Sequence, residues 1–151
     1  LGLNDIQEVI AEMGPFPGAK EFVEWLRTHF QLIILSDTFY EFAHPLMKQL
    51  GWPTIFCHKL ETDEKGMITA YKLRQPDQKR EAVKALHGLN YRVIAAGDSY
   101  NDTTMLGEAD KGFLFDAPEN VIKEFPQFPA IHGYEALKEA IRGASVRDIP
   151  A

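Results

Sequence analysis

The sequence has 151 residues, of which 45% are hydrophobic, and a formal net charge of −6. This composition predicts one substantial core, and the interspersed charges exclude the basic stripe of a nucleic-acid-binding protein. The single cysteine, Cys57, excludes an internal disulfide, and no stretch is apolar for long enough to predict a membrane span or a secretory signal, so we expect a soluble cytoplasmic protein without nucleic-acid or membrane partners.

The first predicted element is a helix over residues 3–13, whose start Asn4 or Asp5 can cap, with Glu8 nearby. The break GPFPG, residues 14–18, follows this helix. It indicates a boundary between residues 1–14 and a main body over residues 15–151.

Two amphipathic helices come next, over residues 19–30 and 38–50, and Pro45 predicts a kink or a late start in the second. Between them, the short apolar run QLIILS, residues 31–36, predicts a buried strand. The two apolar stripes consist of Ala19, Phe22, Val23, Leu26 and Phe30, and of Phe39, Phe42, Ala43, Leu46, Met47 and Leu50.

The rest of the chain continues the alternation of strands and helices. Residues 56–73 alternate imperfectly on both sides of Asp63-Glu64-Lys65-Gly66, which predicts a β-hairpin. Later segments predict a helix over 77–89, a strand over 91–97, short outer strands over 112–115 and 129–132, and a closing helix over 134–141. Short apolar strands that alternate with helices indicate an α/β fold with a parallel sheet.

The predicted strand over 91–97 runs into two carboxylates. Asp98 follows Gly97 directly, and Asp102 comes four residues later, which on a helix would place it on the same face one turn on. Ligands of open parallel sheets lie beyond the carboxyl ends of the strands, and Mg²⁺ prefers oxygen ligands. The pair therefore predicts a magnesium site, with simple capping of the next helix by Asp98 as the alternative.

The predicted strand over 31–36 ends in Ser36, Asp37 and Thr38, where a hydroxyl and backbone N–H groups can hold a phosphate at a helix start. The alternative is a capping box made by Thr38 and Glu41. Lys79 begins the predicted helix over 77–89, where it can neutralise a phosphate or be a solvated surface charge.

In this order, Ser36, Lys79 and GDSYND (97–102) resemble motifs two, three and four of the haloacid dehalogenase superfamily of phosphohydrolases. SDTFYEF and GDSYNDTTML are similar to its phosphoserine phosphatase branch, particularly to members that also transfer the phosphoryl group to homoserine. RQPDQKR and APENVIKEFPQFPA extend the likeness over nearly all of the chain. The resemblance implies a Rossmann-like doubly wound parallel sheet, with residues 1–14 as the end of a helical cap and residues 15–151 as the core.

The same resemblance implies a role for each matching residue. Asp98 is expected to bind Mg²⁺ with Asp102 supporting it, and Ser36 and the Asp37 backbone are expected to bind the phosphoryl oxygens. Lys79 would stabilise the phosphate and the developing charge as the catalytic cation, and Asn101 would contact the substrate. The implied substrate is O-phospho-L-serine, in serine biosynthesis, with water or homoserine as the acceptor. A homodimer is what the family suggests.

Enzymes of this superfamily attack phosphorus with the first aspartate of an Asp-x-Asp or Asp-x-Glu pair at the end of their first strand, and form an aspartyl-phosphate. No strand-like run that ends in such a pair precedes Ser36. The resemblance therefore implies that the nucleophile, its central strand and most of the cap lie upstream of this chain. We expect residues 1–151 alone to fold poorly and to catalyse no turnover, because two strands would keep unpaired edges.

Two other kinds of function stay open from the sequence. A non-catalytic module can keep the phosphate and metal contacts without a nucleophile. A receiver domain also combines aspartates, a hydroxyl and a lysine around Mg²⁺, but there the acidic residues come first, whereas here Ser36 and Lys79 precede Asp98. An Asp-x-Asp or Asp-x-Glu strand encoded upstream would favour the enzyme.

Overall fold

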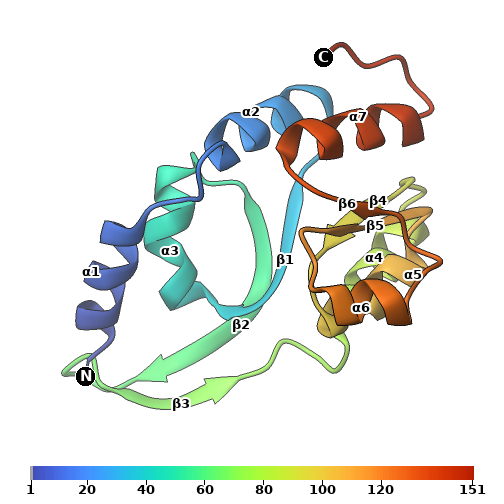
Figure 1. The fold of residues 1–151 in the computed structure, drawn as a ribbon. Coiled ribbons are helices and arrows are strands. Elements are labelled where there is room, and N and C mark those ends of the chain that lie inside the picture. Colours follow the sequence, from blue (N-terminus) through green and yellow to red (C-terminus); the bar gives the residue numbers. More distant parts are fainter. Residues whose placement is uncertain (1) are drawn as a thin grey trace. The chain divides into compact units, whose positions relative to one another are not determined.

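A computed structural model describes residues 2–151, which form α-helices and mainly parallel β-strands, as the sequence predicts (Figure 1). The chain divides into two compact units, Leu1–Pro76 and Asp77–Ala151. Unit 1 contains α1 (Leu3–Met13), α2 (Ala19–His29), β1 (Ile33–Phe39), α3 (Tyr40–Gln49), β2 (Thr54–Thr62) and β3 (Ile68–Lys72). Unit 2 contains α4 (Gln78–Gly88), β4 (Ile94–Gly97), a 3₁₀ turn (Tyr100–Asp102), α5 (Thr103–Glu108), β5 (Lys111–Phe115), α6 (Glu119–Glu124), β6 (Ala130–Ile131) and α7 (Tyr134–Ala144).

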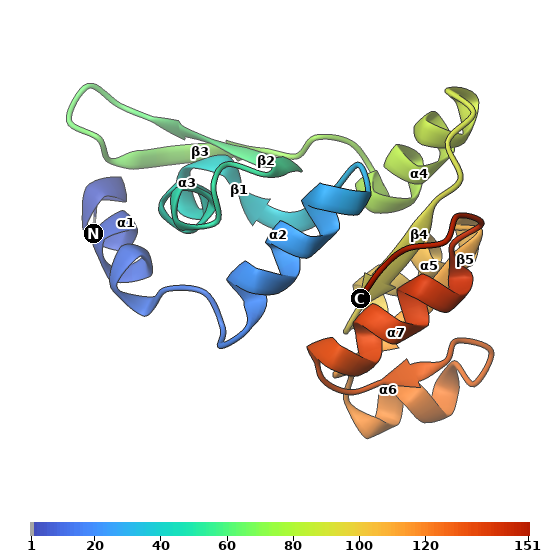
Figure 2. The same ribbon diagram turned by 90° about the horizontal axis from the view of Figure 1, so that it is seen from above.

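The sheet of unit 1 has the strand order β1-β2-β3, with β1 parallel to β2 and β2 antiparallel to β3 (Figure 2). The antiparallel pair is the predicted hairpin. Its turn is held by Asp63, whose Oδ1 accepts the backbone N–H groups of Lys65 and Met67, both at 2.9 Å. Gly66 takes a φ of +79°, a conformation that side chains with a Cβ rarely adopt.

The core of unit 1 forms where α3 packs on the sheet. Its buried members come from the predicted stripe of that helix, and half-buried residues of α2, α3, β1 and β2 complete it. The cluster consists of Ala43, Met47 and Leu50, with Val23, Ile34, Leu46 and Ile55 packed against it.

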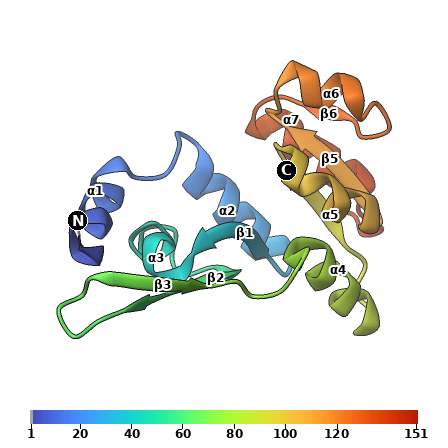
Figure 3. The same cartoon turned by 90° about the horizontal axis from the view of Figure 1, so that it is seen from below.

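Helix α1 lies beside α3 and is tied to it by side-chain amides (Figure 3). Pro45 lies inside α3 and has no N–H, so the carbonyl of Glu41 lacks its helical donor. The side chain of Gln7 supplies that donor, with 2.7 Å between Nε2 and the Glu41 oxygen. The predicted cap of α1 is wrong in detail: the N-cap is Gly2, and Asp5 lies inside the helix and accepts the Gly2 N–H at 3.0 Å.

The sheet of unit 2 is parallel, with the strand order β4-β5-β6. Strand β6 is the outer strand that the sequence predicts, whereas β5 lies in the middle, because it pairs with β4 as well. The core of unit 2 consists of side chains from this sheet and from four helices. They include Val83, Met105, Leu106, Phe113, Leu114, Val121, Leu137 and Ile141.

Strands β1 and β4 are edge strands of their sheets. Among the strands that the structure describes, β1 pairs only with β2, and β4 only with β5. Each therefore keeps an edge of unpaired backbone groups, which agrees with the incomplete core that the sequence predicts. No helix within residues 2–151 is long and apolar enough to cross a membrane.

The loop that enters β4 is held by Asp110. Its Oδ2 accepts the backbone N–H of Val93 at 2.7 Å and faces Nε2 of His87 at 2.8 Å. The Val93 N–H first, and the His87 ring second, lower the pKa of the Asp110 carboxyl below its ordinary value. Asp110 therefore stabilises this loop in its charged form.

We expect Asp110→Asn to lower the free energy of unfolding of the whole protein by about 1 kcal/mol at pH 7. Because the pKa is lowered in the folded state, this advantage of the native residue is present above about pH 4 and is lost as the pH falls through the folded-state pKa. Urea unfolding at pH 7 and pH 3 measures it, with the exposed Asp148→Asn as the control. An equal difference at both pH values would contradict the prediction.

Candidate active-site residues

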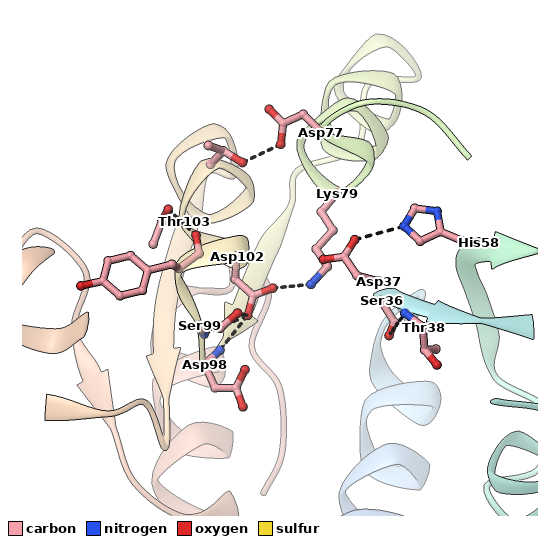
Figure 4. Close-up of polar contacts among 12 residues, drawn as sticks. Ser36, Asp37, Thr38, His58, Asp77, Lys79, Asp98, Ser99, Asp102 and Thr103 are labelled. Atoms are coloured by element: carbon pink, nitrogen blue, oxygen red, sulfur yellow. Dashed lines mark hydrogen bonds and ion pairs between the residues drawn. The ribbon is translucent and has the colours of Figure 1, made fainter. Parts of the chain in front are cut away.

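The carboxyl end of β4 leads into a tight loop that is organised by Asp102. Its Oδ2 accepts the backbone N–H groups of Asp98, at 2.9 Å, and of Ser99, at 3.1 Å. Its Oδ1 accepts a hydrogen bond from Nζ of Lys79 at 2.6 Å (Figure 4). Asp102 is buried, with 7% of its side chain exposed, and Lys79 is nearly buried, with 11% of its side chain exposed. The structure thus brings together Lys79, Asp98 and Asp102, three of the predicted residues.

The predicted helical relation between Asp98 and Asp102 is wrong. Asp98 precedes the 3₁₀ turn, and Ser99 is the N-cap of that turn, so the two carboxylates do not lie on successive turns of one helix. Asp102 instead folds back on the loop, while the carboxylate of Asp98 points away from it (Figure 4). Asp98 is exposed, and no donor to its carboxylate is found within residues 2–151.

Gly97 makes this folding back possible. A Cβ at Gly97 would lie 2.5 Å from Cβ and Cγ of Asp102 and 2.6 Å from its Oδ2, closer than real Cβ contacts allow. The glycine is therefore required by the packing of the Asp102 side chain against the end of β4.

The hydrogen bonds that each carboxylate already accepts decide which of the two can hold a cation. Asp102 already accepts hydrogen bonds at both oxygens, whereas Asp98 is open to solvent. Within residues 2–151 no group of three or more His, Cys, Asp or Glu side chains is placed to hold a metal. Mg²⁺ usually takes only one or two carboxylates and completes its shell with water and substrate phosphate. Asp98 therefore fits as a single protein ligand, and Asp102 fits a supporting role.

Two residues that position the start of α4 are not identified by sequence reasoning. Asp77 is the N-cap of α4 and adopts a left-handed conformation, with φ 49°. Its Oδ1 accepts the hydroxyl of Thr104 at 2.7 Å, which joins the start of α4 to α5. The signal in the sequence is an aspartate directly before a helical pattern. This contact fixes the turn that carries Lys79.

Asn101 lies on the 3₁₀ turn and is exposed. Its neighbour Tyr100 donates a hydrogen bond to Glu124 of α6, and its ring makes an edge contact with Phe125, with 5.8 Å between the ring centroids. The hydrogen bond to Glu124 raises the pKa of Tyr100. The turn that presents Asn101 is thereby anchored to α6.

In unit 1, Ser36, Asp37 and Thr38 lie inside β1, which continues to Phe39. The register of β1 against β2 shifts between Leu35 and Phe39, and the Thr38 N–H donates to Oγ of Ser36 at 3.2 Å. The predicted placement of Ser36 at a helix start is therefore wrong: the first residue of α3 is Tyr40. The strand runs on because an irregular pairing to β2 continues past the apolar run.

The alternative capping box of Thr38 and Glu41 is also wrong. Phe39 occupies the N-cap of α3, and no side chain caps the helix there. The carboxylate of Glu41 instead accepts the backbone N–H of Leu60 at 3.0 Å. Glu41 thus connects α3 to the hairpin.

One further side chain, that of His58, reaches this end of β1, and sequence reasoning does not find it. Nε2 of the buried His58 lies 3.4 Å from Oδ1 of Asp37, and Nδ1 of His58 accepts the backbone N–H of Arg74 at 2.9 Å. Because Nδ1 accepts a hydrogen bond, the neutral ring carries its proton on Nε2, facing Asp37. His58 reaches Asp37 only because β1 pairs with β2, so no local sequence pattern predicts this contact.

Comparison with known proteins gives consistent matches. Residues 3–110 match the family model of haloacid dehalogenase-like hydrolases. The phosphoserine phosphatase ThrH of Pseudomonas aeruginosa is 64% identical over 149 residues, covering 99% of this chain and 73% of that protein. The phosphoserine phosphatase of Pseudomonas syringae pv. tomato is 61% identical over 149 residues, covering 99% of this chain but only 63% of that protein.

Solved structures share the fold. The crystal structure of phosphoserine phosphatase from T. onnurineus, in complex with NDSB-201, matches with a TM-score of 0.72 and 24% identity. The match covers 94% of this chain and 66% of that chain. At this identity the match concerns the arrangement of the elements.

Proposed function

Because the chain belongs to the haloacid dehalogenase-like hydrolases, in their phosphoserine phosphatase branch, we propose that the whole protein is a Mg²⁺-dependent phosphatase of O-phospho-L-serine. The observation that carries the proposal is the largely buried pair of Lys79 and Asp102 beside the exposed Asp98 at the carboxyl end of β4. Phosphoryl transfer needs mainly positioning and charge neutralisation, and this arrangement provides both.

Each residue has a distinct part in the proposal. Asp98 would hold Mg²⁺, which supplies positive charge to the phosphoryl oxygens when bound. Lys79 contributes a second positive charge, and Asp102 holds the lysine and the loop in place. Ser36 and the backbone at Asp37 would bind phosphoryl oxygens.

The remaining parts of the proposal concern the substrate contact, the nucleophile, the acceptor and the oligomeric state. Asn101 would contact the substrate from the 3₁₀ turn. The attacking carboxylate is proposed to come from an Asp-x-Asp or Asp-x-Glu strand outside residues 1–151, and it would form an aspartyl-phosphate that releases the phosphoryl group to water or to homoserine. A homodimer is proposed from the family alone.

Phosphate release from L-phosphoserine by the whole protein, with and without Mg²⁺ and homoserine, tests the proposal. We expect Mg²⁺-dependent turnover, and formation of phosphohomoserine would assign the transferase activity. We expect residues 1–151 alone to release no phosphate, because the nucleophile is not among them. Turnover by residues 1–151 would contradict the assignment of the nucleophile, and an inactive whole protein would favour a phosphate-binding module.

A further inference from the structure

Residues 36–38, of which Ser36 and the Asp37 backbone are proposed to bind phosphoryl oxygens, lie in an irregular stretch of β1. The pairing of β1 with β2 is regular up to Leu35 and resumes at Phe39, and the residues between them lie opposite a single residue of β2, Cys57. Extra residues in one strand leave part of its backbone outside the regular ladder and bend the chain. The conformation of residues 36–38 therefore depends on support from side chains.

The imidazole of the buried His58 gives this support. Its Nδ1 accepts the backbone N–H of Arg74 at 2.9 Å, and its ring packs near Phe39, with 6.0 Å between the ring centroids. Its Nε2 lies 3.4 Å from Oδ1 of Asp37 (Figure 4). A neutral ring that accepts at Nδ1 carries its proton on Nε2, so His58 presents a donor to Asp37 in one fixed direction.

The side chain of Asp37 is unfavourable in a segment that binds a phosphate. Its carboxylate is negatively charged and repels any phosphate group that approaches it. The side chain is 45% exposed, so burial alone does not immobilise it. The donor of His58 gives one carboxylate oxygen a partner on β2, and this contact restrains the negative charge on the β2 side of the segment.

We propose that His58 is a positioning residue for phosphate binding, which acts by holding the carboxylate of Asp37 away from the phosphoryl group. The proposal rests on the proposed function, because residues 36 and 37 are the proposed phosphate contacts. His58 itself touches no reacting atom. Its removal therefore weakens phosphate binding through the charge of Asp37, and the size of the effect depends on that charge.

Two substitutions of His58 separate the roles of its two nitrogens. The side-chain oxygen of His58→Asn can replace Nδ1 as the acceptor for Arg74, but nothing replaces Nε2, whereas His58→Gln can place an amide donor near the position of Nε2. We expect His58→Asn to weaken the binding of inorganic phosphate to the whole protein with Mg²⁺ by about 10-fold, and His58→Gln by less than about threefold. Titration calorimetry measures both dissociation constants.

A double-mutant cycle tests whether His58 acts through the charge of Asp37. Asp37→Asn removes that charge and keeps the shape of the side chain. In the Asp37→Asn background, we expect His58→Asn to weaken phosphate binding by less than about twofold. A purely structural role of His58 would give the same loss in both backgrounds.

His87→Asn is the matched control. It removes a histidine whose Nε2 lies 2.8 Å from an aspartate, Asp110, at the loop that enters β4, and it should leave the dissociation constant of phosphate unchanged. Equal losses for His58→Asn in the two Asp37 backgrounds, or no loss in either, would overturn the inference.

A measurement on the unmodified whole protein decides if His58→Asn does not fold. We expect nitrogen NMR to show the His58 proton on Nε2 and this signal to shift when phosphate is added. A proton on Nδ1, or a signal that phosphate does not move, would overturn the inference. An unmodified protein that does not hydrolyse phosphoserine would instead refute the proposed function, and the inference with it.

Discussion

Asp102→Ala is expected to lower the free energy of unfolding of the whole protein by about 3–5 kcal/mol and to abolish phosphate release. The substitution leaves the largely buried ammonium of Lys79 without its carboxylate and two backbone N–H groups, those of Asp98 and Ser99, without their acceptor. Both the stability and the position of the proposed metal ligand depend on this one side chain.

A double-mutant cycle isolates the ion pair. We expect Asp102→Asn and Lys79→Met each to destabilise the protein, and the double variant to lose less than the sum, by about 1–3 kcal/mol. Urea unfolding measures all four proteins, with the exposed Glu135→Gln as a control that should have little effect. Strictly additive losses would show that the pair contributes no mutual stabilisation.

Gly97→Ala is expected to destabilise the protein by about 1–3 kcal/mol, because the added Cβ overlaps Cβ and Cγ of Asp102. The overlap has to be relieved by moving Asp102 or the end of β4. Since a shift of about 1 Å at such a loop can cost 10²-fold in rate, we expect a loss of about that size in kcat.

A matched glycine separates this overlap from a general effect of alanine. Gly143 lies inside α7, and apart from the neighbouring residues and the backbone of its own helix no described atom is within 4 Å of a Cβ built there. We expect Gly143→Ala to leave kcat unchanged and to stabilise the protein by up to about 1 kcal/mol, because alanine favours helices. Wild-type stability and rate in Gly97→Ala would disprove the steric argument.

The predictions from sequence succeed where a local pattern dominates. The stripe that includes Ala43 and Met47 identifies the core of unit 1, and the turn at Asp63 identifies the hairpin. Helix α6 is missed because six residues are too few to establish a helical period.

The geometry of the candidate residues depends on contacts between distant segments. Asp102 folds back because it is paired with Lys79, 23 residues away, and no spacing within GDSYND expresses this. The side chain of Arg74 is held by the Tyr40 hydroxyl and the Cys57 carbonyl, which lie 34 and 17 residues away in the sequence. Motif resemblance identifies the matching residue types, but it does not specify these partners.

The proline of α3 also determines which arrangement of α1 is acceptable. Without Pro45, the Glu41 carbonyl would be satisfied inside its own helix, and the register of α1 along α3 would depend on other contacts, such as the hydrogen bond from Nε2 of Gln49 to the Ala11 carbonyl at 2.9 Å. With Pro45, a shift of α1 along α3 takes the Gln7 amide away from the part-buried Glu41 carbonyl, which it reaches at 2.7 Å. The hydrogen bond that α3 lacks therefore favours the observed packing of α1 over shifted packings, and it helps to specify one fold.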